Sequence, residues 1–499
     1  MQSCREIVTG FLMPRVCIHG HFYQPPREDP WTGSIHPQSS ALPFADWNQR
    51  ITAECYRSNG RAAILDSTAQ VSARVNTYKY ISFNFGATLL RWMHQHAPDV
   101  IEDLVEADRS SQARLGHGNA VAQAYHHSIL PLANARDKQT EVLWGVRDFE
   151  HRFGRTPEGM WLAETAVDTP TLEVLARHGV RFVILAPRQA QAVRGPESEA
   201  WAPVDADSLD TARPYTVELP SGARIAAFFY SAAPAQGVAF GGWLDNGEKM
   251  AHHLAASEGP LVHFATDGES YGHHHRHGEM GLAYCIRTLS EDLGIELTNY
   301  ARELTDHPPT HTAKIHEASS WSCAHGIGRW STNCGCSIDP ARSGQQEWRP
   351  ILRGAMNSLR DELAEFYIQR MAALGEDPWD MRDRYVHHLL GSEHGVRVAQ
   401  DPIPVRGPGR SELLKLLELQ RHALMMFTSC GWFFDDPGGL EAVQILRYAH
   451  RAICLHQELG GRSLEPFFVE LLDPMKSVDL NLAAGHQLYA DRVAIERRL

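Results

Sequence analysis

The chain has 499 residues and a formal net charge of −13, from 47 Lys and Arg against 60 Asp and Glu. This surplus of acid argues against a nucleic-acid-binding protein, because neutralising phosphates requires Lys and Arg on some face. With 43% hydrophobic and 21% charged residues, the composition also excludes a disordered acidic chain, and the 28 His residues are the feature that needs explanation.

The N-terminal segment lacks the basic cluster and apolar run of a secretory signal, and no run of about 18 apolar residues predicts a membrane span. The nine Cys residues, an odd number spread along the chain, are typical of thiols in a reducing compartment. We therefore expect a soluble, cytoplasmic protein. Cys334 and Cys336 form a close pair, but one intervening residue does not match common zinc spacings, so we interpret them as loop thiols without a metal.

The first predicted strand, Arg15 to His19, runs into the sequence VCIHGHFYQPP. His19 and His21 are two residues apart and therefore point to the same side of an extended chain, where Gln24 adds an amide. This pair has two interpretations, hydrogen bonding to a sugar or ligation of a metal ion. The next polar segment, GHGNAVAQAYHHSILPL, places His117, His126 and His127 in the same expected site.

A second predicted strand, Gly159 to Leu162, precedes Glu164 in the sequence GMWLAETAVDTP. A carboxylate after a strand points into the ligand-binding edge of an α/β protein, and Trp161 offers a face for sugar stacking. The alternative is a helix N-terminal Glu stabilised by the helix dipole. The following helix is predicted to start at Thr169 as N-cap and to stop at Gly179.

Further strands are predicted at Val180 to Ala186, Arg224 to Phe229 and Leu261 to Thr266, and the segment Pro187 to Gly222 is expected to be a long irregular loop. The last strand runs into LVHFATDGESYGHHHRHGE, where Asp267 and Glu269 stand together. Two carboxylates at a strand end are hard to explain as structure, because burying charge is costly. The segment EASSWSCAHGIGRW then mixes Trp321 with polar donors.

After about residue 345 the pattern becomes helical, with predicted helices at Leu352 to Leu374, Ser411 to Phe427 and Leu440 to Leu459. The short strands alternating with helices before this point are typical of an α/β fold. The sequence therefore predicts two domains, residues 14–345 and residues 346–499, the second one α-helical.

Taken in order, HGHFYQPP, GHGNAVAQAYHHSILPL, WLAET, TDGESYGHH and EASSWSCAHGIGRW resemble the short conserved regions of glycoside hydrolase family 57. The resemblance covers about residues 14–335. It implies an α/β fold, an incomplete (β/α)7 barrel, followed by the helical C-terminal domain. It also implies a retaining hydrolase or transglycosylase of α-linked glucans, with Glu164 as nucleophile, Asp267 as general acid/base, and no cofactor or metal. The residues expected to bind the oligosaccharide or polysaccharide substrate are His19, His21, Gln24, His126, His127, Trp161, Glu269, Tyr271, His273, Trp321 and His325.

Two further classes of protein stay open at this point. A metal-dependent carbohydrate enzyme, a deacetylase or a zinc mannosidase, would use His19, His21, Asp267 and one of His273 to His275 as zinc ligands. A non-catalytic sugar-binding protein would bind oligosaccharide and leave its linkages unchanged.

Overall fold

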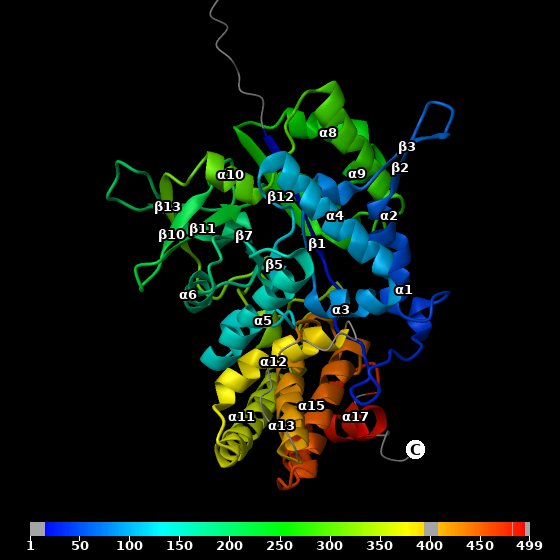
Figure 1. The fold of residues 1–499 in the computed structure, drawn as a ribbon, viewed down its shortest axis with the longest axis vertical. Helices are drawn as coiled ribbons and strands as arrows, with labels where there is room; N and C mark the ends of the chain where they lie inside the picture. Colours follow the sequence, from blue (N-terminus) through cyan, green and yellow to red (C-terminus); the bar gives the residue numbers. More distant parts are fainter. Residues whose placement is uncertain (1–14, 394–407, 482, 495–499) are drawn as a thin grey trace, which may run out of the picture.

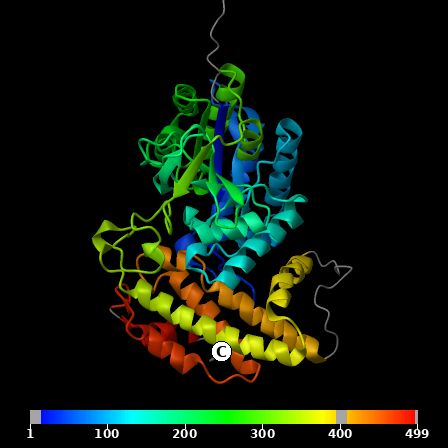
Figure 2. The same cartoon turned by 90° about the vertical axis from the view of Figure 1, so that its left-hand side faces the viewer.

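The computed structural model describes residues 15–393, 408–481 and 483–494. The start of the first predicted domain at residue 14 and the end of the second at residue 499 lie outside these ranges. An α/β part, which contains the N-terminal strand, sits on a group of long C-terminal helices (Figure 1). Turning the molecule shows these helices stacked below the α/β part (Figure 2).

The strands are short, and most of those in the α/β part are buried. Their bounds are β1 Arg15–Phe22, β2 Ala62–Leu65, β3 Val71–Val75, β4 Ser82–Phe85, β5 Ala122–Gln123, β6 Met160–Trp161, β7 Phe182–Leu185, β8 Ala190–Arg194, β9 Ala202–Pro203, β10 Tyr215–Glu218, β11 Arg224–Phe229, β12 Leu261–Asp267, β13 His311–Ile315, β14 Lys476–Ser477 and β15 Ala483–Ala484.

The helices cover these strands and form the C-terminal part. They are α1 Trp47–Ile51, α2 Arg57–Gly60, α3 Ala87–His96, α4 Pro98–Leu115, α5 Ala135–Phe153, α6 Thr169–Arg177, α7 Ala232–Ala239, α8 Gly247–Ala255, α9 Gly278–Arg287, α10 Tyr300–Asp306, α11 Trp348–Leu374, α12 Pro378–Glu393, α13 Pro408–Met425, α14 Cys430–Phe433, α15 Leu440–Glu458, α16 Glu465–Leu472 and α17 Gly485–Arg492.

The parallel strands follow one another side by side. Strand β1 lies between β12 and β4, β5 pairs with β6, and β7 pairs with β11, all in parallel. Single bridges from Phe83 to Ala120 and from Gly159 to Phe182 join these sets. The backbone N–H of Ser231, after β11, donates to the carbonyl of His263 in β12 at 2.8 Å. The carboxyl ends of these strands therefore face one side of the molecule, where α/β proteins bind their ligands.

The predicted strands of the α/β part are confirmed, with β1 three residues longer than expected. Every residue of β1 except Arg15 is buried, as is typical of a parallel strand covered on both faces. The predicted helix after Glu164 is α6, but its N-cap is Asp168, whose carboxylate accepts from the backbone N–H of Thr171. The expectation of Thr169 as N-cap is wrong by one residue.

The prediction of an irregular loop from Pro187 to Gly222 is wrong. The segment contains β8, β9 and β10, which extend the sheet beyond β11 together with β13. The antiparallel pairs β10–β11 and β8–β13 make this extension different from the parallel strands. Pro187, Pro196, Pro214 and Pro220 stand between these short strands, so the prolines mark turns, not an absence of regular structure.

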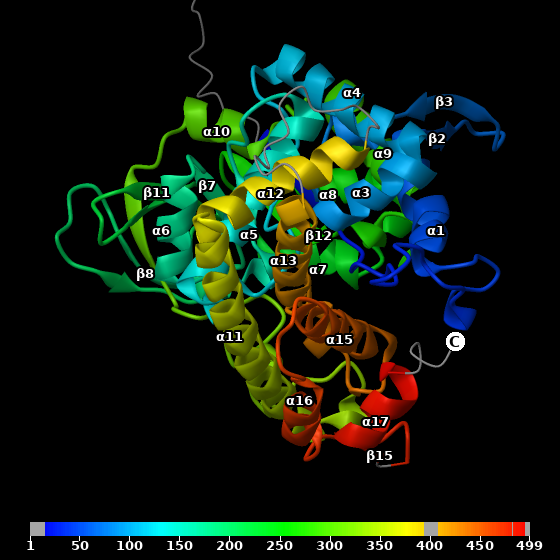
Figure 3. The same ribbon diagram turned by 60° about the horizontal axis from the view of Figure 1, so that its bottom comes forward.

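The three predicted C-terminal helices are confirmed as α11, α13 and α15, which pack together with α16 and α17 (Figure 3). Their apolar core continues into the α/β part, where it includes Tyr125, Trp144 and Trp330. Helix α12 lies on α5 through the buried ion pair of Arg382 with Asp137, 2.8 Å apart. The domain boundary at residues 345 and 346 stays a prediction. Across the described residues, no helix combines the length and apolar character needed to cross a bilayer.

Candidate active site

Glu164 follows β6 in a tight turn, Ala163–Thr165, with a left-handed backbone at φ 57° and ψ 23°. Residues other than Gly rarely adopt this conformation, and such strain is often found at functional sites. The Trp321 backbone N–H donates to the Glu164 carbonyl at 3.0 Å. The carboxylate oxygen Oε2 accepts from the indole Nε1 of Trp321 at 2.9 Å and from the Ser322 hydroxyl at 2.6 Å. The late segment around Trp321 therefore orients this carboxylate.

Opposing effects act on the pKa of Glu164. Burial raises the pKa, whereas the hydrogen bonds from Ser322 and Trp321 and the positive charge of Arg329 lower it, with a net increase. Hydrogen bonds to a carboxylate favour its charged form. The site therefore offers donors that stabilise an ionised Glu164.

Asp267 is the last residue of β12 and is exposed to solvent. Within the described residues, its carboxyl group accepts no hydrogen bond from the protein. Desolvation by the surrounding protein, together with the charges of Glu269 and Glu164, raises the pKa of Asp267 well above its usual value. The raised pKa favours the protonated form of Asp267, and its exposed side chain can contact a ligand.

The two carboxyl groups interact electrostatically, since the charge of Glu164 contributes to the raised pKa of Asp267. Tyr230, which follows β11, interacts with Asp267: its pKa is raised by burial and, to a smaller extent, by the charge of Asp267. Its ring is also edge-on to Trp321, with centroids 6.4 Å apart. A carboxyl group with donors for its charged form, beside one whose pKa is raised, is an arrangement suited to acid–base chemistry.

Glu269 is buried and belongs to the support of the site. Its Oε1 accepts from the Tyr56 hydroxyl at 2.5 Å and from the Tyr23 backbone N–H at 3.1 Å. Burial raises its pKa to about 7, against the opposing effect of these hydrogen bonds. The predicted direct contact between Glu269 and substrate does not fit a carboxylate enclosed by protein donors, and its effect reaches the site through the charge felt by Asp267.

The expected histidines of β1 form a buried stack. The ring of Trp161 stacks with His19 and with His21, with centroids 5.0 and 4.8 Å away, and His127 stacks on His21 at 5.1 Å. Trp161 has no exposed surface and stacks with both imidazoles. Its role as a sugar-stacking face stays a prediction, and in this structure its ring contacts protein groups only.

Hydrogen bonds fix the orientation of these imidazoles. The amide oxygen of Asn84 lies 3.1 Å from His19 Nε2, and its amide nitrogen donates to His21 Nδ1 at 2.9 Å. His21 Nε2 lies 3.2 Å from His127 Nε2, whose Nδ1 is 2.7 Å from the Ser429 hydroxyl. Burial lowers the pKa of His19 and of His21 to about 3. These rings are therefore neutral, as expected for groups that exchange hydrogen bonds.

Several predicted substrate ligands contact other groups of the protein. His126 is buried, with Nδ1 2.7 Å from Glu141, and Tyr271 is fully buried and accepts a hydrogen bond from Thr266 at 3.1 Å. His273 pairs with Glu54 at 2.5 Å. Protein groups thus already contact these three side chains, and their contact with substrate stays a prediction. Gln24 is only partly buried, and its Oε1 accepts from Arg27 at 3.1 Å.

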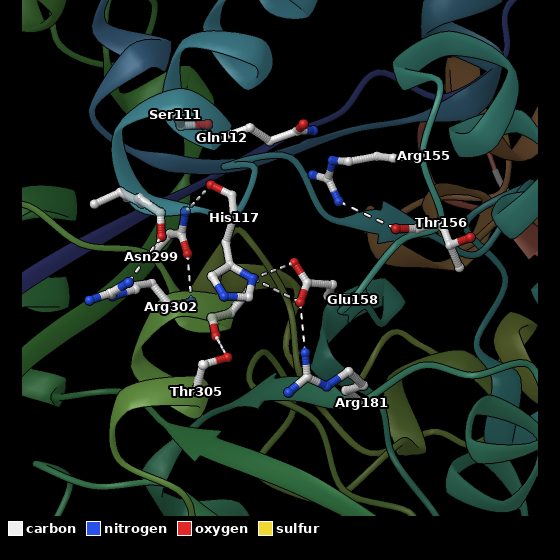
Figure 4. Close-up of polar contacts among 12 residues, drawn as sticks. Ser111, Gln112, His117, Arg155, Thr156, Glu158, Arg181, Asn299, Arg302 and Thr305 are labelled. Atoms are coloured by element: carbon white, nitrogen blue, oxygen red, sulfur yellow. Dashed lines mark hydrogen bonds and ion pairs between the residues drawn. The ribbon is translucent and has the colours of Figure 1, made fainter.

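His117, expected on the active face, lies beside Glu158 instead (Figure 4). It pairs with Glu158 at 3.0 Å, and Glu158 also pairs with Arg181 at 2.7 Å. Glu158 and Arg181 precede β6 and β7, so this cluster stands at the amino ends of the strands. Polar residues at that end of an α/β protein stabilise the fold and do not perform chemistry.

The residues of the segment EASSWSCAHGIGRW lie in two different places. Trp321 contacts Glu164, whereas His325 is exposed and lies beside Cys336, with Nδ1 and Sγ 3.5 Å apart. The contact of His325 with substrate stays a prediction. Among the described residues, the group whose ligand atoms converge as in a metal site contains Cys323, His325, Cys334 and Cys336. The histidines of β1 and Asp267, the alternative zinc ligands, are not part of this converging group.

Sequence reasoning missed several residues that the structure brings to the site. Ser322 directly follows Trp321, so a hydroxyl beside the predicted aromatic was the available signal. Tyr230 and Asn84 stand at or after the ends of β11 and β4, the position where the rest of the site was sought. No motif distinguishes these residues, and only their positions relative to the strands could have indicated them.

The fold and site thus define an α/β protein with a pair of interacting carboxyl groups at the carboxyl ends of parallel strands. The model of Glycosyl hydrolase family 57 matches residues 39–316, more than half of the chain, and the chain belongs to this family. A second model, a domain of unknown function (DUF3536), matches residues 345–497.

Individual known proteins also resemble this chain. Alpha-amylase 1 of Dictyoglomus thermophilum is 28% identical over 105 residues, which are 21% of this chain and 15% of the amylase. A solved exo-type maltose-forming amylase from Pyrococcus sp. ST04 has a TM-score of 0.70 at 15% identity, covering 96% of this chain and 88% of that one. A branching enzyme from Thermococcus kodakaraensis has a TM-score of 0.56 at 14% identity, covering 96% and 98%. These identities indicate a shared fold.

Proposed function

We propose that the protein is a retaining glycoside hydrolase or transglycosylase that acts on α-linked glucans. The observation that carries the proposal is the interaction of Glu164, held by Trp321 and Ser322, with the solvent-facing Asp267. Membership of the family supports this function, and so does the resemblance in fold to an amylase and a branching enzyme.

We further propose that the α/β part forms an incomplete barrel of seven parallel strands. It is supported by the order of neighbours β12, β1, β4, β5, β6, β7 and β11 and by the backbone contact of Ser231 with His263. In such a barrel, side chains that are distant in sequence meet at the carboxyl ends of the strands. A cytoplasmic location stays a prediction from the composition.

The first chemical step joins the sugar to the enzyme. The Glu164 carboxylate attacks the anomeric carbon of the glucan while Asp267 gives its proton to the departing glycosidic oxygen. The bond from Glu164 to the sugar forms as the bond to the leaving oxygen breaks. A retaining enzyme requires the two carboxyl groups to stand about 5–5.5 Å apart.

The second step releases the sugar. Asp267, now ionised, takes a proton from water or from the hydroxyl of an acceptor sugar, and the resulting oxygen nucleophile displaces Glu164 from the anomeric carbon. Two inversions at the same carbon retain its configuration. Hydrolysis and transfer differ only in whether water or a sugar hydroxyl enters at this point.

The test is covalent trapping of the nucleophile. Incubation with a fluorinated α-glucosyl fluoride, which forms the glycosyl-enzyme rapidly and releases it slowly, should add one glycosyl mass to the peptide that contains Glu164. Glu164→Gln should remain unlabelled and lose about 3 or more orders of magnitude in turnover of α-glucans.

The matched control is Glu158→Gln, which changes a carboxylate of the same type at the opposite end of the strands. It should keep both labelling and turnover. Wild-type turnover by Glu164→Gln, or labelling of another residue, overturns the nucleophile assignment. An inverted anomeric product excludes the retaining scheme.

A further inference from the structure

Three cysteines and a histidine converge beside the active-site segment. Cys323 and His325 closely follow Trp321, and Cys334 and Cys336 return to them from the end of the same loop. One ligand atom from each residue lies within 4.8 Å of the three others. Cys323 is buried, Cys334 and Cys336 are partly buried, and His325 is exposed, so the group lies at the border between the core and solvent.

Three of the six separations between these atoms are given by their contacts and match the edges of a tetrahedron around one ion. Zinc takes thiolates at about 2.3 Å and imidazoles at about 2.0–2.1 Å in tetrahedral sites, which places two sulfurs about 3.8 Å apart and a sulfur and a nitrogen about 3.5 Å apart. Cys323 Sγ lies 3.9 Å from Cys334 Sγ and 3.7 Å from Cys336 Sγ. Cys336 Sγ lies 3.5 Å from His325 Nδ1.

Neither a disulfide nor an iron–sulfur cluster fits this geometry. A disulfide joins its sulfurs at about 2.0 Å, whereas Cys323 stands nearly twice that distance from both partners. An iron–sulfur cluster places several atoms between its ligand sulfurs, so the ligands cannot all lie as close together as the edges of one tetrahedron. We propose that Cys323, His325, Cys334 and Cys336 bind a single structural zinc ion.

The surroundings suit the charge of such a site. Three thiolates and one divalent ion carry a net charge of −1, and Arg349 of α11 is fully buried beside them. Its guanidinium donates to the Cys336 carbonyl at 2.7 Å, while its nearest carboxylate, Asp435, is 3.9 Å away. A buried cation requires a compensating negative charge, and an anionic zinc site would supply one.

The four protein ligands fill the coordination of zinc and leave no position for water, which is the mark of a structural site. The site is thus separate from the chemistry of Glu164 and Asp267. It also has a definite place in the fold, because Cys323 follows Trp321 and Ser322, the donors to Glu164, and Arg349 ties Cys336 to the C-terminal helices. Zinc would close this loop and fix the donors of Glu164.

The experiment measures metal content in the full-length chain expressed with zinc in the medium. Elemental analysis should give about one zinc per chain, and cobalt exchanged into the protein should show the absorption of tetrahedral, thiolate-bound Co²⁺. The double variant Cys334→Ser/Cys336→Ser should lose at least tenfold of the zinc. Cys285→Ala, a buried cysteine of α9, should leave the stoichiometry unchanged.

A second measurement needs no variant. In native wild-type protein, Cys334 and Cys336 are partly exposed, yet they should resist alkylation until a strong chelator removes the metal, and mass spectrometry should then find both modified. Zinc-free wild-type protein from zinc-replete cells, full zinc in the double variant, or rapid alkylation before chelation overturns the proposal. None of these readouts depends on glycosidase activity.

Discussion

The hydroxyl of Ser322 donates a 2.6 Å hydrogen bond to Oε2 of Glu164, the oxygen that also accepts from the indole of Trp321 at 2.9 Å. The donors come from a segment more than 150 residues downstream of Glu164. These hydrogen bonds favour the ionised carboxylate, whereas burial favours the protonated form. The ionisation proposed for Glu164 therefore depends on residues far away in the sequence, Trp321 and Ser322.

Ser322→Ala should raise the pKa of Glu164, because it removes a donor to the charged form. Since a hydrogen bond to a charged group contributes about 1.5–3 kcal/mol, kcat/KM should fall by about 10- to 100-fold. The acid limb of the pH–rate profile should move to higher pH. Ser331→Ala changes a serine of the same loop that donates only to the Ile327 carbonyl, and should behave as wild type. An unchanged profile for Ser322→Ala contradicts the role of this bond.

Glu269→Gln should lower the pKa of Asp267, because the charge of Glu269 is one of the causes that raise it. Asp267 works as an acid only while protonated, so activity is lost as the pH rises through its pKa. The alkaline limb of kcat/KM should therefore move to lower pH in the variant. Glu54→Gln, which alters the pair with His273, is the control and should leave this limb in place. A shift in the opposite direction argues against Asp267 as the acid.

Arg382→Met should destabilise the docking of α12 on α5. Arg382 and Asp137 are both buried and 2.8 Å apart, and removing Arg382 leaves the buried carboxylate, among the described residues, with only Arg360, 4.0 Å away, as a nearby cation. The expected loss in the free energy of unfolding is about 3–5 kcal/mol, measured in urea. Arg384→Met, on the same helix, breaks an exposed pair with Asp380 and should cost less than about 1 kcal/mol. Equal effects of the two substitutions refute this account.

His126→Ala should reduce stability and leave substrate binding intact. The variant exposes no new surface to substrate but leaves the buried carboxylate of Glu141 without its 2.7 Å partner. About 3 kcal/mol of unfolding free energy should be lost, with KM for a soluble α-glucan within about twofold of wild type. His486→Ala, which removes an exposed pair with Asp473, provides the surface control. A large rise in KM for His126→Ala restores the original expectation of a substrate ligand.

The elements that the sequence predicted well are those with a local cause. Strand β11 has the predicted bounds because an apolar run between turn residues is a local pattern. Helices α11 and α15 follow from apolar residues at helical spacing. Asp267 was found because a carboxylate directly after a buried strand is visible along the chain.

The predictions that the structure does not support concern residues whose contacts come from parts of the chain distant in sequence. His126 and His117 look alike in the sequence, yet one is enclosed by α5 and the other stands at the amino ends of the strands. Trp161 was expected to meet sugar, but the rings of β1 cover it.

The sequence by itself determined the α/β pattern, the helical C-terminal region and the candidacy of Glu164 and Asp267, since each depends on neighbours within a few residues. Only the tertiary structure decided which histidines reach the site, which donors orient Glu164, and that Cys334 and Cys336 meet Cys323 and His325. Burial, charge interactions and coordination geometry act through space, and residues of unremarkable spacing along the chain acquire their chemistry only when the fold brings them together.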